Sequence, residues 1–235
     1  MTLAENLAAV EARIAAACSK AGRPRESVRL LPVSKTQPAS VVLEAYEAGC
    51  RRFGENKVQE GLAKAEELAS LPDIEWSLIG HLQTNKARDA ARFATEFQAL
   101  DSLRVAEALD RRLQASGRGM DVLIEVDTSG EETKFGVPPA EVVALARQLG
   151  AYSSLRLRGL MTIAANTTDE TVISSCFDAM VALREQLKDA LGEGHDELSM
   201  GMSGDFELAI ERGSTCVRVG TAIFGARRYP AAGLS

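Results

Sequence analysis

The chain has 235 residues and a net charge of −6, with 46% hydrophobic and 26% charged residues. This balance is typical of a globular protein, and the length suits a single barrel domain over residues 1–235. No block of Lys and Arg stands out, which argues against nucleic acid and anionic membranes as partners. No apolar run reaches the roughly 18 residues that a membrane-spanning helix needs.

Cysteine and histidine usage narrows the chemistry. The four cysteines, Cys18, Cys50, Cys176 and Cys216, are widely spaced and form no CxxC pair, which fits a reducing compartment. Residues 1–5 lack the basic and apolar regions of a secretory signal, so we expect a cytoplasmic protein. With only His81 and His195, we expect no metal site.

Apolar spacing predicts a helix over residues 2–21, which Gly22 and Pro24 end. Strands are then expected at 28–35, 52–56, 75–80, 97–101, 121–127, 156–161, 197–200 and 216–220. Helices are expected between them at 38–48, 57–69, 84–95, 102–115, 138–149, 168–191 and 205–212. Strands that alternate with helices predict an α/β fold with a parallel sheet, and eight such units at this length predict a (β/α)8 TIM-type barrel with an extra N-terminal helix.

The first predicted strand is an apolar run that ends on Lys35, just before Thr36-Gln37-Pro38 interrupts it. Active sites of such barrels lie at the carboxyl ends of the strands. A partly desolvated lysine loses its charge more easily, and a neutral amine can attack an aldehyde. The alternative is a solvated lysine that merely follows a strand.

The ends of the seventh and eighth predicted strands are typical of a phosphate site. Residues 199–205, which include Ser199 and Ser203, supply small and hydroxyl side chains before a helix. Gly220 and Thr221 allow backbone N–H groups to approach a ligand, and these two loops commonly bind phosphate in barrels. The alternative is that Ser203 or Asp205 only caps the helix over 205–212.

Other candidates at the same end of the predicted barrel each have two interpretations. Arg218 lies within an apolar strand and needs an acceptor, either a carboxylate inside the barrel or a ligand. His81 is either a proton carrier or a residue at a helix entry. Asn56 either faces the ligand or forms a turn. Met161 and Met200 either wall a pocket for an apolar ring or belong to the core.

Six stretches together resemble one family, the pyridoxal phosphate homeostasis proteins, which are similar to the N-terminal barrel of alanine racemases. The stretches span residues 31–36, 53–60, 79–86, 157–161, 198–203 and 213–227. The resemblance implies a fold-type III barrel in which Lys35 holds pyridoxal 5′-phosphate (PLP) as a Schiff base, the internal aldimine.

The resemblance also implies the rest of the cofactor site. Arg218 would face the pyridine nitrogen, while Ser203, Gly220 and Thr221 would hold the phosphate. The remaining expected cofactor-binding residues are Asn56 and Met161 near the ring, together with His81, Ser199 and Met200.

The function implied is PLP homeostasis, that is storage, buffering or delivery of the cofactor to apo PLP-dependent enzymes. We expect a monomer with no catalytic residues. The alternatives are a PLP-dependent racemase or related carbanion-forming enzyme, and a barrel with no cofactor. Racemisation needs a proton donor and acceptor on opposite faces of the substrate. No tyrosine falls at a predicted strand end, and the chain to Ser235 is expected to lack the C-terminal β-domain that supplies the second base in racemases.

Overall fold

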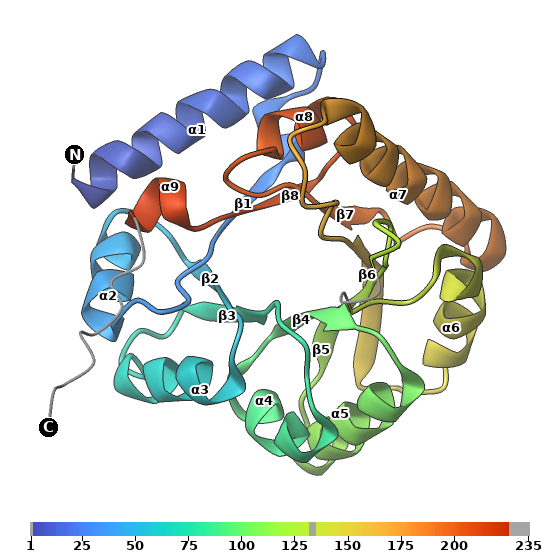
Figure 1. Cartoon of the computed structure of the whole chain (residues 1–235). Coiled ribbons are helices and arrows are strands. Elements are labelled where there is room, and N and C mark those ends of the chain that lie inside the picture. The colour runs from blue at the N-terminus through green and yellow to red at the C-terminus, as the bar shows by residue number, and fades with distance from the viewer. Residues whose placement is uncertain (1, 132–134, 226–235) are drawn as a thin grey trace, which may run out of the picture.

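The computed structural model describes residues 2–131 and 135–225. Eight parallel strands surround a central axis and helices cover their outer side, which confirms the predicted (β/α)8 barrel (Figure 1). The strands are β1 (Arg29–Pro32), β2 (Arg52–Glu55), β3 (Glu75–Leu78), β4 (Glu96–Leu100), β5 (Met120–Glu125), β6 (Leu155–Met161), β7 (Glu197–Ser199) and β8 (Cys216–Val219).

Helices connect successive strands, as the alternating pattern of the sequence predicts. They are α2 (Ala39–Glu47), α3 (Val58–Glu67), α4 (Ala87–Phe93), α5 (Leu103–Ala115), α6 (Val142–Leu149), α7 (Glu170–Leu191) and α8 (Phe206–Glu211). Helix α1 (Leu3–Lys20) precedes β1, and α9 (Thr221–Phe224) follows β8. Short 3-10 turns, η1 (Arg25–Ser27), η2 (Thr84–Lys86) and η3 (Pro139–Glu141), precede β1, α4 and α6. In the described part of the chain, no helix is both long enough and apolar enough to cross a bilayer.

The sheet closes at the junction of β1 and β2. Strands pair in the order β1-β8-β7-β6-β5-β4-β3-β2, and one parallel bridge between Val33 and Gly54 joins the two ends. The N–H of Ser34 donates to the carbonyl of Gly54 at 3.0 Å. A Cβ at Gly54 would lie 3.3–3.4 Å from side-chain atoms of Val33, Ile79 and Leu31, so glycine suits this close approach.

The additional helix α1 lies outside the ring of helices, beside α8 and α9 (Figure 1). Its apolar side buries Val10 and Ile14. On its exposed side, Arg13 pairs with Glu207 of α8 at 2.6 Å, and the Arg13 guanidinium lies 4.5 Å from the ring centre of Phe206. Helix α1 therefore packs on the outer side of the barrel, against the last two helices, α8 and α9.

A chain of polar side chains runs through the barrel interior. Ser199 of β7 donates to Gln98 of β4 at 2.7 Å, although three strand steps separate them in the sheet. Gln98 in turn donates to Glu96 at 2.8 Å, and Arg29 reaches Glu96 at 2.8 Å. These residues therefore belong to the inward-facing set that alternates with outward-facing residues along barrel strands.

Most strand boundaries fall within a few residues of their predicted positions. The main difference concerns β1, which ends at Pro32 rather than at residue 35. Lys35 consequently lies in the turn that leads to α2, and not on the strand. The helix predicted over 84–95 is divided into the 3-10 turn η2 and the short helix α4.

Candidate functional site

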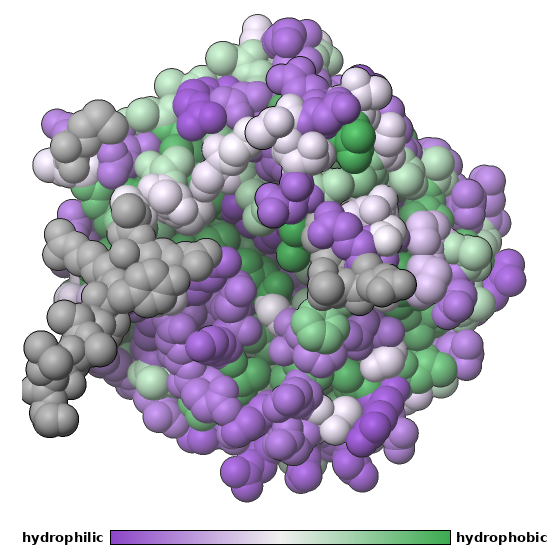
Figure 2. Space-filling model, viewed as in Figure 1, coloured by the Kyte–Doolittle hydropathy of each residue, from purple (hydrophilic) through white to green (hydrophobic). Residues whose placement is uncertain are grey.

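A cavity of about 260 Å³ lies at the carboxyl ends of the strands. Six of the predicted site residues line it, namely Lys35, Asn56, Ser203, Arg218, Gly220 and Thr221. They come from the ends of β1, β2, β7 and β8, which are far apart in the sequence but neighbours in the barrel. Viewed as in Figure 1, the centre of the molecular surface is hollowed, with apolar residues deep in the hollow and polar residues around it (Figure 2).

Arg218 is 4% exposed and its guanidinium is held in a fixed orientation. Its Nη1 donates to the carbonyl and the hydroxyl of Ser199, both at 2.7 Å, and its Nη2 donates to the carbonyl of Thr162 at 2.8 Å. Burial lowers the pKa of Arg218, while the charges of Asp205 and Glu125 act against that shift. Among the described residues no carboxylate forms an ion pair with Arg218 at hydrogen-bonding distance, so the barrel salt bridge considered from the sequence is not formed.

The turn before α8 offers hydrogen-bond donors to the cavity. Asp205 is the N-cap of α8 but makes no side-chain capping bond, and its carboxylate instead accepts the Met202 N–H at 2.6 Å. Within the described residues, neither the hydroxyl nor the N–H of Ser203 has a hydrogen-bond partner, and the N–H of Gly204 has none. The capping alternative is therefore not realised, and these donors remain for a ligand.

His81 does not line the Lys35 cavity. It borders a neighbouring cavity of about 710 Å³ with Asn85, Arg104 and others. Its Nδ1 lies 2.9 Å from a carboxylate oxygen of Asp101, and its ring stacks on Phe135 with centroids 4.1 Å apart. The imidazole is therefore held by residues that follow β4 and β5.

Three further predicted site residues lie beneath the cavity. Met161, Ser199 and Met200 are each 0% exposed and do not line it. Ser199 accepts a hydrogen bond from Arg218, and therefore acts on the cavity through that side chain. The two methionines belong to the core, which is the alternative interpretation of them.

Sequence reasoning missed part of the apolar wall. Val33, Ile79 and Ile163 line the cavity, and Met202 and Gly204 of the predicted phosphate loop complete the lining. Val33 and Ile79 come directly after β1 and β3, and Ile163 follows the end of β6 by two residues. These apolar residues could have been found from their position just beyond a strand end, because the chain still faces the mouth of the barrel there.

Glu125 adds a buried carboxyl group beneath the same end of the barrel. It is 6% exposed, and its Oε2 has no hydrogen-bond partner among the described residues. Burial raises the pKa of Glu125 to about 7, with a further rise from Asp101 and an opposing effect of Arg218. Sequence reasoning placed no weight on this residue.

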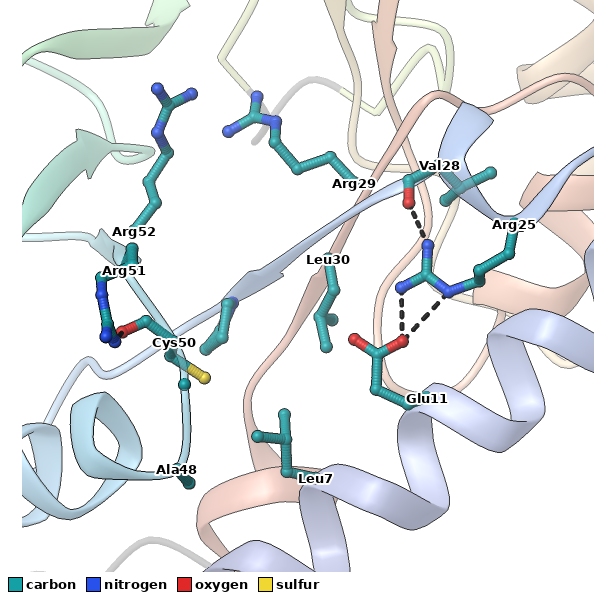
Figure 3. A pocket seen from close by; sticks show the side chains of 12 residues that line it. Leu7, Glu11, Arg25, Val28, Arg29, Leu30, Ala48, Cys50, Arg51 and Arg52 are labelled. Carbon is teal, nitrogen blue, oxygen red and sulfur yellow. Dashed lines mark hydrogen bonds and ion pairs between the residues drawn. The ribbon is translucent and has the colours of Figure 1, made fainter.

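A separate cavity of about 420 Å³ lies at the opposite end of the barrel, between α1 and the starts of β1 and β2 (Figure 3). Arg25 points to Glu11, with Nε···Oε2 at 3.0 Å, and also donates to the Val28 carbonyl. Burial and the nearby Glu11 raise the pKa of Cys50 to about 11, so the thiol stays protonated at neutral pH.

The other arginines around this second cavity are also ion-paired. Arg51 pairs with Asp73, Arg29 with Glu96 and Glu197, and Arg52 with Glu75 and Glu96. Burial disfavours the charged form of Glu96, but Arg29, Ser77 and Arg52 outweigh it and lower its pKa. Each arginine that lines this second cavity is therefore paired with a carboxylate, and we assign the functional site to the carboxyl end.

Comparison with known proteins supports the barrel fold. The family model described as "Alanine racemase, N-terminal domain" matches residues 6–228. An alanine racemase structure from Clostridium difficile is 16% identical, with a TM-score of 0.77, and its likeness covers 98% of this chain and 58% of that one. At that identity the likeness concerns the fold alone.

Much closer relatives share the full length. The pyridoxal phosphate homeostasis protein of Pseudomonas aeruginosa is 46% identical over 230 residues, which is 98% of both chains. The structure of PipY from Synechococcus elongatus with PLP bound is 38% identical, with a TM-score of 0.83, and covers 95% of this chain and 100% of that one. The chain therefore belongs to the pyridoxal phosphate homeostasis protein family, which has the barrel of the alanine racemase N-terminal domain.

Proposed function

We propose that this protein binds PLP through a Schiff base on Lys35 and acts in PLP homeostasis inside the cell. The observation that carries the proposal is the shared cavity, in which Lys35, Arg218 and the donor-rich turn at Ser203 meet. The printed names of its relatives, and the PLP-bound structure of PipY, support the same conclusion.

The residues of the cavity fit the cofactor. An aromatic ring suits the apolar walls formed by Val33, Ile79 and Ile163. A phosphate dianion suits the hydroxyl of Ser203 and backbone N–H groups, since hydrogen bonds to charged acceptors are the strong ones. Thr221 lies on the same side of the cavity and would add a further hydroxyl.

PLP would supply an aldehyde, whose carbon is the partner for the amine of Lys35. The neutral amine of Lys35 would bond to that carbon, and the aldehyde oxygen would leave as water with both amine hydrogens. The Lys35 side chain is half-buried at the edge of the cavity.

Arg218 would face the pyridine nitrogen in this arrangement. A guanidinium stays charged at every physiological pH and has only donors to offer. It would therefore keep the ring nitrogen unprotonated and the ring a weak acceptor of electrons. This property supports a role in holding the cofactor rather than in carbanion chemistry.

We further propose that the protein is a cytoplasmic monomer and that apo PLP-dependent enzymes receive its cofactor. Transfer can be followed by mixing the loaded protein with an apo-enzyme and measuring the activity that the enzyme regains. Regained activity above that given by an equal concentration of free PLP supports delivery, whereas an equal rate contradicts it.

The decisive experiment for the binding site is a spectrum followed by peptide mapping. The loaded protein should absorb at about 420 nm, and borohydride should abolish this band while fixing the pyridoxyl group on the lysine. Label on the peptide with Lys35, and loss of the band in Lys35→Ala, are expected. Label mainly on Lys57, Lys86 or Lys134 would refute the assignment.

A further inference from the structure

A buried ionic cluster lies behind the turn that carries Lys35. It consists of Glu55 at the end of β2 and of Glu60 and Lys64 on α3. Lys64 is only 5% exposed, and its ammonium donates to carboxylate oxygens of Glu55 at 2.6 Å and Glu60 at 2.7 Å. Burying such a cluster costs desolvation energy, so its position in the fold calls for a reason.

The cluster binds the backbone on both sides of Lys35. Before it, Lys64 donates to the Ser34 carbonyl at 2.8 Å, and the Ser34 hydroxyl donates to Glu55 at 2.6 Å. After it, the Thr36 N–H donates to a Glu60 carboxylate oxygen. That same oxygen accepts from Lys64, so one cluster holds both neighbours of the lysine.

The backbone of Thr36, which the cluster binds, has an unusual conformation. Its φ is +66°, and it is the one non-glycine residue with a positive φ in the described part of the chain. A β-branched residue rarely adopts this left-handed conformation, which persists only where its surroundings enforce it. The N–H of Thr36 itself donates to the charged carboxylate of Glu60.

We propose that Glu60 and Lys64 are positioning residues, which hold Thr36 in the left-handed conformation and so direct the Lys35 side chain into the cavity. This inference rests on the proposed function, because it concerns the same lysine. The cluster does not touch the cofactor. It acts through the backbone of Ser34 and Thr36, and without it the turn would relax to a negative φ and rotate Lys35.

The test is Glu60→Gln, which keeps the shape of the side chain but replaces the charged acceptor with a neutral one. Glu60 is partly exposed, so the variant should fold. We expect the dissociation constant for PLP to rise about tenfold, since charge-assisted bonds are roughly twice as strong as neutral ones. The matched control is Glu66→Gln on the same helix, which loses an exposed pair with Arg92 and should bind as the unchanged protein does.

Rescue separates positioning from general stability. Glycine adopts φ = +66° without steric cost, so Thr36→Gly added to Glu60→Gln should restore most of the lost affinity. Melting temperatures of all variants are measured without cofactor. If Glu60→Gln binds PLP normally, or if its loss is not restored by Thr36→Gly, the positioning role is wrong. If the unchanged protein shows no Lys35-dependent band, the proposed function itself fails.

Discussion

Arg218 and Ser203 differ in the hydrogen bonds that they make within the protein. The guanidinium of Arg218 already has three hydrogen bonds within the protein, which fix its plane before anything binds. The hydroxyl of Ser203 makes no hydrogen bond among the described residues, so it can turn toward an acceptor. If PLP binds as proposed, Arg218 would define where its ring lies, whereas Ser203 would contribute directly to affinity.

Replacing Ser203 tests this contribution. Ser203→Ala should remove one donor to the phosphate and weaken PLP binding by about 1.5–3 kcal/mol, or roughly ten- to a hundredfold. Titration followed by absorbance gives the dissociation constants. Pyridoxal, which has no phosphate, serves as the control and should bind equally to both proteins. An equal loss for pyridoxal would mean that Ser203 shapes the cavity instead of holding phosphate.

Glu125 should make stability depend on pH. Because burial raises its pKa to about 7 in the folded protein, the unfolded chain loses this proton first as the pH rises. The folded state then binds more protons than the unfolded state, so its stability falls between about pH 4.5 and pH 7. This loss of stability is zero at low pH, where Glu125 is protonated in both states. It reaches its full size above about pH 7.

Glu125→Gln removes this titration. The variant should gain on the order of 1–3 kcal/mol over the unchanged protein at pH 8 and much less at pH 5. Urea unfolding at the two pH values measures the difference. A constant difference at both would show that Glu125 is not the group that titrates.

At the scale of elements, the barrel could be predicted because hydrophobic periodicity and the strand–helix alternation repeat along the whole chain. It was harder to predict which side chains line the cavity. A sequence locates strand ends, but it does not say which way the chain turns after them. His81 follows β3, yet its Nδ1 lies 2.9 Å from a carboxylate oxygen of Asp101 and the side chain does not line the Lys35 cavity.

The positioning cluster was missed for a different reason. Lys64 and Glu60 lie on a helix, where charged residues usually face solvent and carry no signal of burial. Only the packing of α3 against the β1–α2 turn brings them to Lys35. For Met200 the error was the opposite. Its position at a predicted strand end suggested that it lines the cavity, but its side chain is buried in the core.

Helix α1 contributes stability from outside the site. Ile14 is fully buried, and Ile14→Ala should lower the free energy of unfolding by about 2–5 kcal/mol through lost burial and a residual cavity. The PLP dissociation constant should stay unchanged, because Ile14 does not line the cavity. Lys20→Ala, which removes an exposed pair with Glu211, is the control and should change stability far less. Weaker PLP binding in Ile14→Ala would instead connect this helix to the site.

For the whole molecule, the number of candidate proton carriers at the cavity bears on whether the protein could invert amino acids. Among the described residues that line the cavity, Lys35 is the one candidate for a general base. Tyr46 lies on α2 and bonds to Asp73, and Tyr152 follows α6. Tyr229 falls outside the described residues. Inversion of an amino acid needs proton transfer on both faces, which one lysine does not supply.

We therefore expect no inversion of alanine or other amino acids at a physiological rate. Chiral chromatography measures the enantiomer ratio over time, with Lys35→Ala run in parallel to reveal contaminating racemase. Solvent-deuterium exchange without inversion is compatible with a single base. Turnover near the enzyme median of about 10 per second, absent in the variant, would make the protein a racemase.

The junction of β1 and β2 divides the cavity into two groups of residues. Lys35 and Thr221 follow the paired strands β1 and β8, whereas Asn56 and Ile79 follow the paired strands β2 and β3. The bridge between Val33 and Gly54, together with the bonds from Ser34 and Thr36 to the buried ionic cluster, holds the two groups at a fixed spacing. A ligand that spans the mouth of the barrel would therefore meet two sides whose separation is set before it binds.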